Sequence, residues 1–196
     1  MHTALAKADL QQLFTEARTH HAWLDEPVSD ALLKEVYDLA KWGPTSANST
    51  PMRMLFVKSP AAKEKLRPAL LGSNVDQVKA APVTAIIAYD EKFYEELPRL
   101  FPAFDAKSMF VGNEPLIKET EMRNGSLQGA YFMLAARSLG LDVGPMSGFN
   151  NATVDQAFFQ GTSWKSNFLC NIGHGDNTKL HPRGPRLTFE QACKIV

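Results

Sequence analysis

Apolar residues repeat at helical spacing in three long stretches of the chain. They predict helices over residues 8–20, from the segment 28–30 to a stop at Gly43-Pro44, and over residues 124–139. Either Ser29 or Asp30 can cap the second helix, because both side chains accept hydrogen bonds from free backbone N–H groups. The third helix is rich in small residues, so we expect it to pack closely at the centre of the fold. The expected buried stripes are Leu10, Leu13, Phe14 and Ala17; Leu32, Leu33, Val36, Leu39 and Ala40; and Leu127, Ala130, Tyr131, Leu134 and Leu139.

Short apolar runs between turn residues predict four strands, at residues 54–57, 82–89, 141–143 and 167–172. Strands separated by helices, with helical stretches gathered at the start, favour an α+β fold over a regular doubly wound sheet. The segment 90–119 is rich in aromatic residues and proline, so we expect an excursion that caps part of the fold. No repeat or linker divides the chain, which predicts a single domain over residues 1–196. Further short helices are expected from Pro60, over 74–80 and over 151–159.

Composition removes several classes of function. The chain has 21 Lys plus Arg and 21 Asp plus Glu, so no overall field recruits nucleic acid or an anionic membrane. The longest apolar run, residues 80–89, is about half the ~20 residues needed to span a bilayer. The start of the chain lacks the apolar core of a signal peptide. We therefore expect a cytoplasmic protein, in which buried thiols at Cys170 and Cys193 are favoured over the alternative of one disulfide between them.

Two polar segments are candidate binding elements. The segment from Pro44 to Pro51 carries five hydroxyl or amide side chains, which suit either an elaborate turn or the polar edge of a planar ligand. The segment from Gly144 to Gly148 follows a predicted strand, and the N–H groups of Ser147 and Gly148 are potential donors to a ligand atom. An ordinary strand-to-helix turn explains the second segment equally well.

Three arginines are candidate phosphate ligands, because the guanidinium group forms paired hydrogen bonds with phosphate oxygens. Arg18 lies at the end of the first predicted helix, and Arg183 and Arg186 lie in the proline-rich C-terminal tail, which should hold them in an extended conformation. A solvated surface position is the alternative for each of them.

Motifs for other chemistries fail. Gly173-His174-Gly175 has no third glycine and no following helix, which argues against a dinucleotide loop. The segment 144–148 has one residue too many between Gly144 and Ser147 for a Gly-x-Ser-x-Gly nucleophile elbow. The five histidines lack metal-ligand spacing. An enzyme with this sequence must therefore import its chemistry as a cofactor.

In order along the chain, these segments resemble the nitroreductase family of FMN enzymes, and more closely its malonic semialdehyde reductase subgroup of pyrimidine degradation. The resemblance implies an α+β sandwich with a central, mostly antiparallel sheet flanked by helices. It also implies a homodimer of domain-swapped style, formed through the long central helix, with FMN sites shared between subunits. The segments that carry the resemblance are Lys41–Pro51, Ala81–Ala85, Pro145–Phe149 and Pro185–Leu187.

The resemblance also implies roles for individual residues. Arg18, His20 and Arg186 match the positions at the flavin phosphate. Asn74 and Gln77 match the pair that hydrogen-bonds the pyrimidine edge of the flavin. The residues that match the loop reaching the flavin from the partner are Pro44, Thr45, Ser46 and Asn48, and those that match the turn at flavin N5 are Met146, Ser147 and Gly148.

The implied reaction is ping-pong hydride transfer, with NADPH or NADH as reductant and no motif that chooses between them. The first candidate oxidant is malonic semialdehyde, which gives 3-hydroxypropionate, and Arg53 could bind its carboxylate. One alternative is a broad reductase of nitroaromatics or quinones. The other is a flavin-binding homodimer without turnover.

Overall fold

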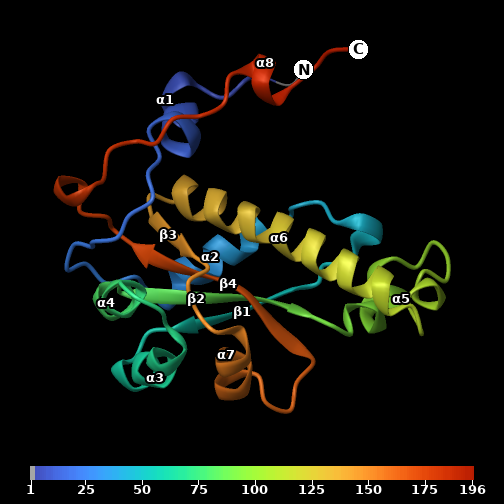
Figure 1. The fold of residues 1–196 in the computed structure, drawn as a ribbon. Coiled ribbons are helices and arrows are strands. Elements are labelled where there is room, and N and C mark those ends of the chain that lie inside the picture. The colour runs from blue at the N-terminus through green and yellow to red at the C-terminus, as the bar shows by residue number, and fades with distance from the viewer. Residues whose placement is uncertain (1–2) are drawn as a thin grey trace.

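A four-stranded antiparallel sheet forms the middle of the fold, in the order β1-β2-β4-β3. The computed structural model describes residues 3–196. Strands β1 (Met52–Val57) and β3 (Asp142–Met146) lie at the edges, and β2 (Val83–Asp90) and β4 (Trp164–Gly173) lie between them (Figure 1). The expected α+β class and antiparallel sheet are confirmed.

Helices cover both faces of this sheet, because side chains of a strand alternate between the two faces. In β2, Ala85 and Ile87 belong to one hydrophobic cluster, and Ile86 and Ala88 belong to another. All four are fully buried. On the first face lie α2 (Asp30–Ala40) and α6 (Glu114–Ser138), and on the second lie α3 (Pro60–Leu66), α4 (Asn74–Ala80) and α7 (Asn151–Phe158) (Figure 1).

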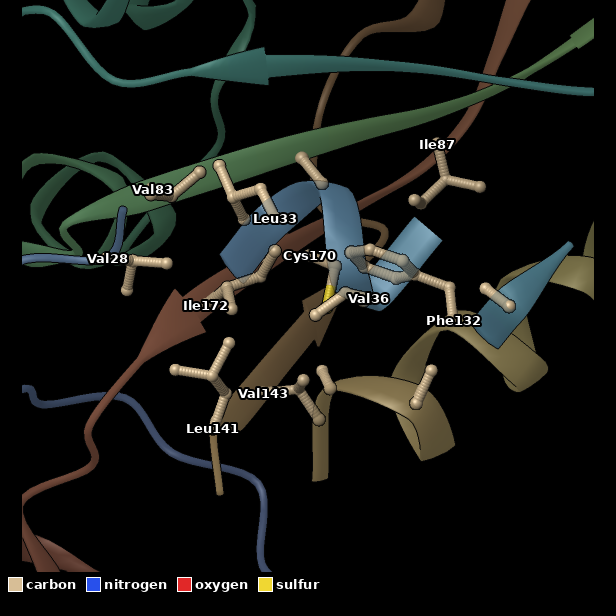
Figure 2. Packing of buried hydrophobic residues seen from close by; sticks show 14 of the residues in the cluster. Val28, Leu33, Val36, Val83, Ile87, Phe132, Leu141, Val143, Cys170 and Ile172 are labelled. Atoms are coloured by element: carbon tan, nitrogen blue, oxygen red, sulfur yellow. The ribbon is translucent and has the colours of Figure 1, made fainter. Parts of the chain in front are cut away.

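The first cluster is the larger core (Figure 2). Phe132 of α6 lies in it without solvent exposure, next to Val36 of α2. Truncating a phenylalanine in such a position typically costs about 3–5 kcal/mol. Ser29 caps α2 by accepting the N–H of Leu32, which decides between the two predicted caps.

The long helix α6 is central, as predicted, but its buried face differs from the prediction. Gly129 packs so tightly that a Cβ atom there would lie 2.6 Å from the ring of Phe168. Leu127 and Tyr131, predicted to be buried, are 47% and 40% exposed. The prediction was wrong because it followed the large apolar residues, whereas small residues let the helix approach the sheet. The buried face comprises Ile117, Thr120, Glu121, Asn124, Gly125, Gln128, Gly129, Phe132, Ala135 and Ala136.

The N-terminal helix is shorter than predicted and contributes nothing to the core. It consists of α1 (Lys7–Leu10) and a π-helical turn (Gln11–Thr15), neither of which has a buried residue. The chain then becomes extended because it pairs with the sheet: Thr19 bridges to Val143 and Trp23 to Gly175. Arg18 is therefore held by this extended segment and not by a helix end.

The aromatic excursion ends earlier than predicted. Helix α6 begins at Glu114, ten residues before the expected start, and Asn113 caps it by accepting the N–H of Leu116. The excursion contains two 3-10 turns and α5 (Leu97–Leu100). Phe93 packs edge-on against Phe110 with ring centroids 5.0 Å apart. This small core is closed by Ile117 of α6, so the excursion caps the N-terminal half of that helix.

The C-terminal tail leads away from the sheet and carries a last short helix, α8 (Phe189–Ala192) (Figure 1). All residues from 181 to 196 are exposed. Cys170 is a buried free thiol as expected, but Cys193 is exposed because it lies in this tail. Within residues 3–196, no helix combines the length and apolar character needed to cross a membrane.

Candidate functional site

Arginines from three distant parts of the chain line one cavity of about 620 Å³. Arg18 comes from the extended N-terminal segment, Arg137 from the end of α6, and Arg183 and Arg186 from the tail. The cavity also includes His21, and no Asp or Glu lies in its lining. Such a concentration of guanidinium groups without a carboxylate has the chemistry that suits an anion with several oxygens, such as phosphate.

Backbone carbonyl groups hold the arginines in place. Arg18 donates to the carbonyl oxygen of His181, and Arg183 donates to that of Ala17 at 3.1 Å. These two bonds join the tail to the N-terminal segment. Each guanidinium has five N–H donors, so these contacts leave others free to bind a ligand.

Arg137 and Arg186 complete the set. Arg137 donates to the carbonyl of Leu13 at 3.4 Å, and burial lowers the pKa of its guanidinium, which still carries its charge at neutral pH. Arg186 donates only to the carbonyls of Gly184 and Pro185, both at 3.0 Å. Arg137 was missed from the sequence, because a single arginine near the end of a helix resembles an ordinary dipole-compensating residue.

A row of amide and imidazole groups adjoins the cavity. His21 Nδ1 lies 3.0 Å from Gln77 Oε1 on α4, and Asn74, one helical turn earlier, donates to the carbonyl of Gly148 at 2.9 Å. A Cβ atom at Gly148 would lie 2.6 Å from the Asn74 amide nitrogen, so a larger residue there would displace that side chain. The structure thus brings four predicted site residues, Arg18, Gln77, Asn74 and Gly148, into one connected region.

The turn after β3 offers free hydrogen-bond donors. Met146 is the last residue of β3, so the turn begins at Ser147, three residues later than the predicted strand end implied. Ser147 is exposed, and across residues 3–196 neither its N–H nor that of Gly148 donates to another part of the protein. Two adjacent free N–H groups at the end of a strand suit an acceptor atom on a ligand.

His20 has a structural position. Its side chain is 2% exposed and lies against Gly175, where a Cβ atom would come within 2.1 Å of the ring. Nδ1 is 3.3 Å from Asp142 Oδ1, and Nε2 is 3.2 Å from Asn177 Oδ1. The imidazole therefore joins the N-terminal segment to the end of the sheet and does not line the arginine cavity.

The predicted ligand loop is strained. Ala47, Asn48 and Thr50 have positive φ angles of 49°, 47° and 37°. Such angles cost about 1–2 kcal/mol for residues other than glycine and are most unusual for β-branched threonine. Strain of this kind persists only where surrounding contacts enforce it.

Buried side chains enforce this loop conformation. Asn124 Oδ1 accepts the N–H of Ser46 at 2.9 Å, and Gln128 Oε1 accepts that of Met52 at 2.9 Å. Arg53 donates to the carbonyls of Thr50 and Met52, each at 3.0 Å, and to Asp90 Oδ2 at 2.8 Å. The guanidinium of Arg53 is thus engaged by the protein itself, and Arg53 also lines a cavity with Asn48 and Thr50, so its binding of a substrate carboxylate stays a prediction.

Within one chain, the loop lies far from the arginine cavity. Its anchor Asn124 and the cavity residue Arg137 are both on α6, thirteen residues apart, which corresponds to about 20 Å along a helix. Asn48 also donates to the carbonyl of Leu100 in α5, near the N-terminal half of α6. The structure therefore does not bring Pro44, Thr45, Ser46 and Asn48 together with Arg18, Arg186, Asn74 and Gln77 in a single chain.

Glu121 is a buried carboxyl on the same face of α6 as Asn124 and Gln128. It is 3% exposed, and Oε2 has no hydrogen-bond partner in the described part of the chain. Its pKa is raised to about 7, chiefly by burial and in addition by the charges of Glu91 and Glu114, while Lys118 opposes the shift. This carboxyl was missed because glutamate on a helix is normally solvated. Its spacing from Asn124 and Gln128 is the only signal in the sequence.

Fold and cavity define a class of protein: an α+β sandwich with an arginine-lined anion site beside a row of amides. A model of the nitroreductase family matches residues 15–174. The match covers most of the chain, so the protein belongs to the nitroreductase family.

Relatives similar over their whole length carry one shared description. A protein of Stenotrophomonas maltophilia (strain K279a) is 60% identical over 196 residues, with all of both chains covered. A protein of Rhodopseudomonas palustris (strain TIE-1) is 55% identical, again with complete coverage. Both are named "putative NADH dehydrogenase/NAD(P)H nitroreductase".

Solved structures with the same fold are more distant in sequence. A nitroreductase of Exiguobacterium sibiricum 255-15, solved in complex with FMN, matches with a TM-score of 0.82 at 18% identity, covering 99% of this chain and 100% of that one. An enone reductase of gut-bacterial fatty acid metabolism matches with a TM-score of 0.84 at 18% identity, covering 98% and 100%. At this identity the likeness establishes the fold.

Proposed function

We propose that this protein is an FMN-dependent oxidoreductase that uses NADPH or NADH to reduce a small organic oxidant. The observation that carries the proposal is the arginine cavity and its connection, through His21 and Gln77, to Asn74 and Gly148. FMN has a phosphate at one end, which suits the arginine cavity, and a planar, hydrogen-bonding ring at the other, which suits the amide groups. The relatives named for NAD(P)H and the FMN-bound structural neighbour support the same cofactors.

Bound FMN would supply hydride transfer from the reduced nicotinamide to the oxidant. The protein contributes orientation and electrostatics. Arg18 and Arg186 hold the phosphate, Asn74 and Gln77 hold the pyrimidine edge, and the N–H groups of Ser147 and Gly148 face the reacting part of the ring. His20 lies outside the cavity and holds the N-terminal segment in place through its contacts with Asp142 and Asn177.

We further propose a homodimer in which each flavin site takes its second wall from the partner's loop at residues 44–48. The separation of about 20 Å between loop and cavity within one chain supports this arrangement. A second copy also accounts for the outward face of α6, where Met122, Leu127 and Tyr131 are each at least 40% exposed. Exposed apolar faces of this kind are typical of subunit interfaces. The apolar tail residues that a partner would also cover are Leu187, Phe189, Ile195 and Val196.

The substrate proposed first is malonic semialdehyde, reduced to 3-hydroxypropionate, on the strength of the resemblance of the segments at 41–51, 81–85, 145–149 and 185–187. The second candidate is a nitroaromatic or quinone, which the names of the relatives favour. Steady-state kinetics with both substrates tests the order. A kcat/KM for malonic semialdehyde well below that for a nitroaromatic would reverse it.

The cofactor proposal has a direct test. The purified protein should be yellow, and anaerobic addition of NADPH or NADH should bleach the flavin absorption band. Re-oxidation by the aldehyde or the nitroaromatic then completes a turnover. A flavin that binds but is not bleached by either nucleotide would identify a binding protein without turnover, and a colourless protein that takes up no added FMN would refute the proposal.

A further inference from the structure

The loop at residues 44–52 is held at both ends through its backbone. The N–H of Ser46 donates to Asn124, and the N–H of Met52 donates to Gln128. Both acceptors come from α6, four residues apart, and both side chains are at least 97% buried. The residues with positive φ lie between these two anchor points.

The orientation of the first anchor is fixed. The amide nitrogen of Asn124 donates to the carbonyl of Thr120 at 2.8 Å, one turn earlier in α6, so Oδ1 must face Ser46. Inside the loop, Thr45 Oγ1 accepts the N–H of Thr50 at 3.1 Å. The strained conformation is thus held by the side chains of α6 that accept backbone N–H groups of the loop, and by Thr45 within the loop itself.

The anchors use the backbone and leave the outer surface of the loop uncovered. Pro44, Ser46 and Asn48 are all exposed. A loop that served only to connect α2 with β1 would relax to unstrained angles, because the chain gains nothing locally from three left-handed residues. Stored strain together with an uncovered polar surface indicates a contact surface formed before its ligand arrives.

We propose that Asn124 and Gln128 are positioning residues for the flavin site. From the buried face of α6 they hold the loop at 44–52 in the shape that it presents to the flavin of a second copy. This inference rests on the proposed function. It adds that the helix at the subunit contact also sets the shape of the shared wall of the site.

The test removes one acceptor without changing side-chain volume much. Gln128→Met deletes the oxygen that accepts the N–H of Met52 and leaves that group without a partner. We expect hydrogen exchange at the Met52 amide to accelerate and the FMN dissociation constant to rise about tenfold, the effect of one buried hydrogen bond. Gln128→Glu keeps an acceptor at the same place, so it should restore most of the lost affinity.

Ser29→Ala is the matched control for lost stability. It removes the cap of α2, at the far end of that helix from the loop, and should lower the melting temperature by an amount similar to Gln128→Met. Its FMN affinity and its exchange rate at Met52 should equal those of the wild type. A positioning role moves affinity as well as stability, whereas a merely structural role moves stability alone.

Each outcome has one meaning. If wild-type protein binds FMN and Gln128→Met binds it equally well, the positioning role is refuted while the proposed function stands. If the wild type itself binds no FMN, the proposed function fails. In that case, unchanged exchange at Met52 in Gln128→Met would refute the anchoring as well. Asn124→Leu, measured at the Ser46 amide, gives the same decision independently for the other end of the loop.

Discussion

The arginine cavity and the loop at 44–52 are built in opposite ways. The cavity is assembled from segments distant in the sequence, and each of its arginines is held by one or two hydrogen bonds to backbone carbonyls. The loop is one continuous segment, strained and anchored by buried side chains. The cavity can adjust its charged side chains to an anion, whereas the loop presents a fixed shape. Binding by charge therefore tolerates movement of the arginine side chains, whereas binding by shape requires the loop to keep its conformation.

The largest expected effect comes from the adjustable region. Replacing both Arg18 and Arg186 by alanine should weaken FMN binding by about 3–6 kcal/mol, since each charge-assisted hydrogen bond contributes about 1.5–3 kcal/mol. Flavin fluorescence titration measures the change. Arg67→Ala is the control, because Arg67 pairs with Glu64 on the exposed surface outside the cavity. Equal affinity in the double variant would mean that the cavity holds another anion.

The second prediction separates the two regions. Leu127→Asp places a charge on the exposed face of α6 and should convert a dimer to monomers, since an apolar interface rejects an unpaired charge. Loss of the partner's loop should then weaken FMN binding by about 3 kcal/mol, the contribution of a few contacts. Sedimentation and flavin titration on one sample test both steps. Monomers that retain full FMN affinity would show that each chain holds its flavin alone.

The third prediction concerns pH and the helix that anchors the loop. The carboxyl of Glu121 has a pKa of about 7 in the folded chain, against an ordinary value of 4.5. The folded state therefore binds the proton more tightly than the unfolded state. The resulting stabilisation is complete below the ordinary value and is lost as pH rises from there through about 7.

Glu121→Gln isolates this effect, because glutamine imitates the protonated acid and does not titrate. The variant and the wild type should have similar free energies of unfolding near pH 4.5, and the variant should be more stable by about 3 kcal/mol well above pH 7. Urea unfolding at several pH values gives the curve. A difference that does not change with pH would refute the assignment of the proton to Glu121.

The smallest expected effect tests the clamp at the end of the loop. Arg53→Lys keeps a positive charge beside Asp90 but loses the planar fork that also donates to the carbonyls of Thr50 and Met52. We expect a cost of about 1 kcal/mol, seen as faster hydrogen exchange at residues 50–53 with little change elsewhere. Unchanged exchange at residues 50–53 would show that Arg53 does not help to hold the strained conformation of the loop.

The same contrast decides what could be predicted from the sequence. The starts of some helices follow from local signals, such as Ser29 as a cap and Pro60 at the start of α3, whereas the start of α6 and the end of the first helix do not. The outward face of α6 could not be predicted, because Leu127 and Tyr131 are of residue types that are usually buried. The helix instead approaches the sheet at Gly125 and Gly129, which have no side chain. The periodicity of a sequence indicates which residues are apolar, but it does not indicate how closely a helix packs against the sheet.

The site residues differ in the same way in how far they could be predicted from the sequence. Guanidinium chemistry made Arg18 and Arg186 candidates, and only the family resemblance assigned them to one site; the structure places both at one cavity. Asn124 and Gln128 could not be predicted, because they act only through the backbone of a loop more than seventy residues earlier. The local hydrogen-bonding use of such side chains is visible in a sequence, whereas their long-range use depends on the fold.

The position of Arg183 and Arg186 has a consequence for the biosynthesis of the protein. Translation proceeds from the N-terminus, so these arginines emerge from the ribosome after the sheet and α6 have had the chance to fold. The full set of arginines is therefore present only once the tail has been made and has packed against the N-terminal segment. We expect a nick between residues 175 and 183 to leave the sheet and α6 in place, to separate Arg183 and Arg186 from Arg18 and Arg137, and to weaken the binding of FMN.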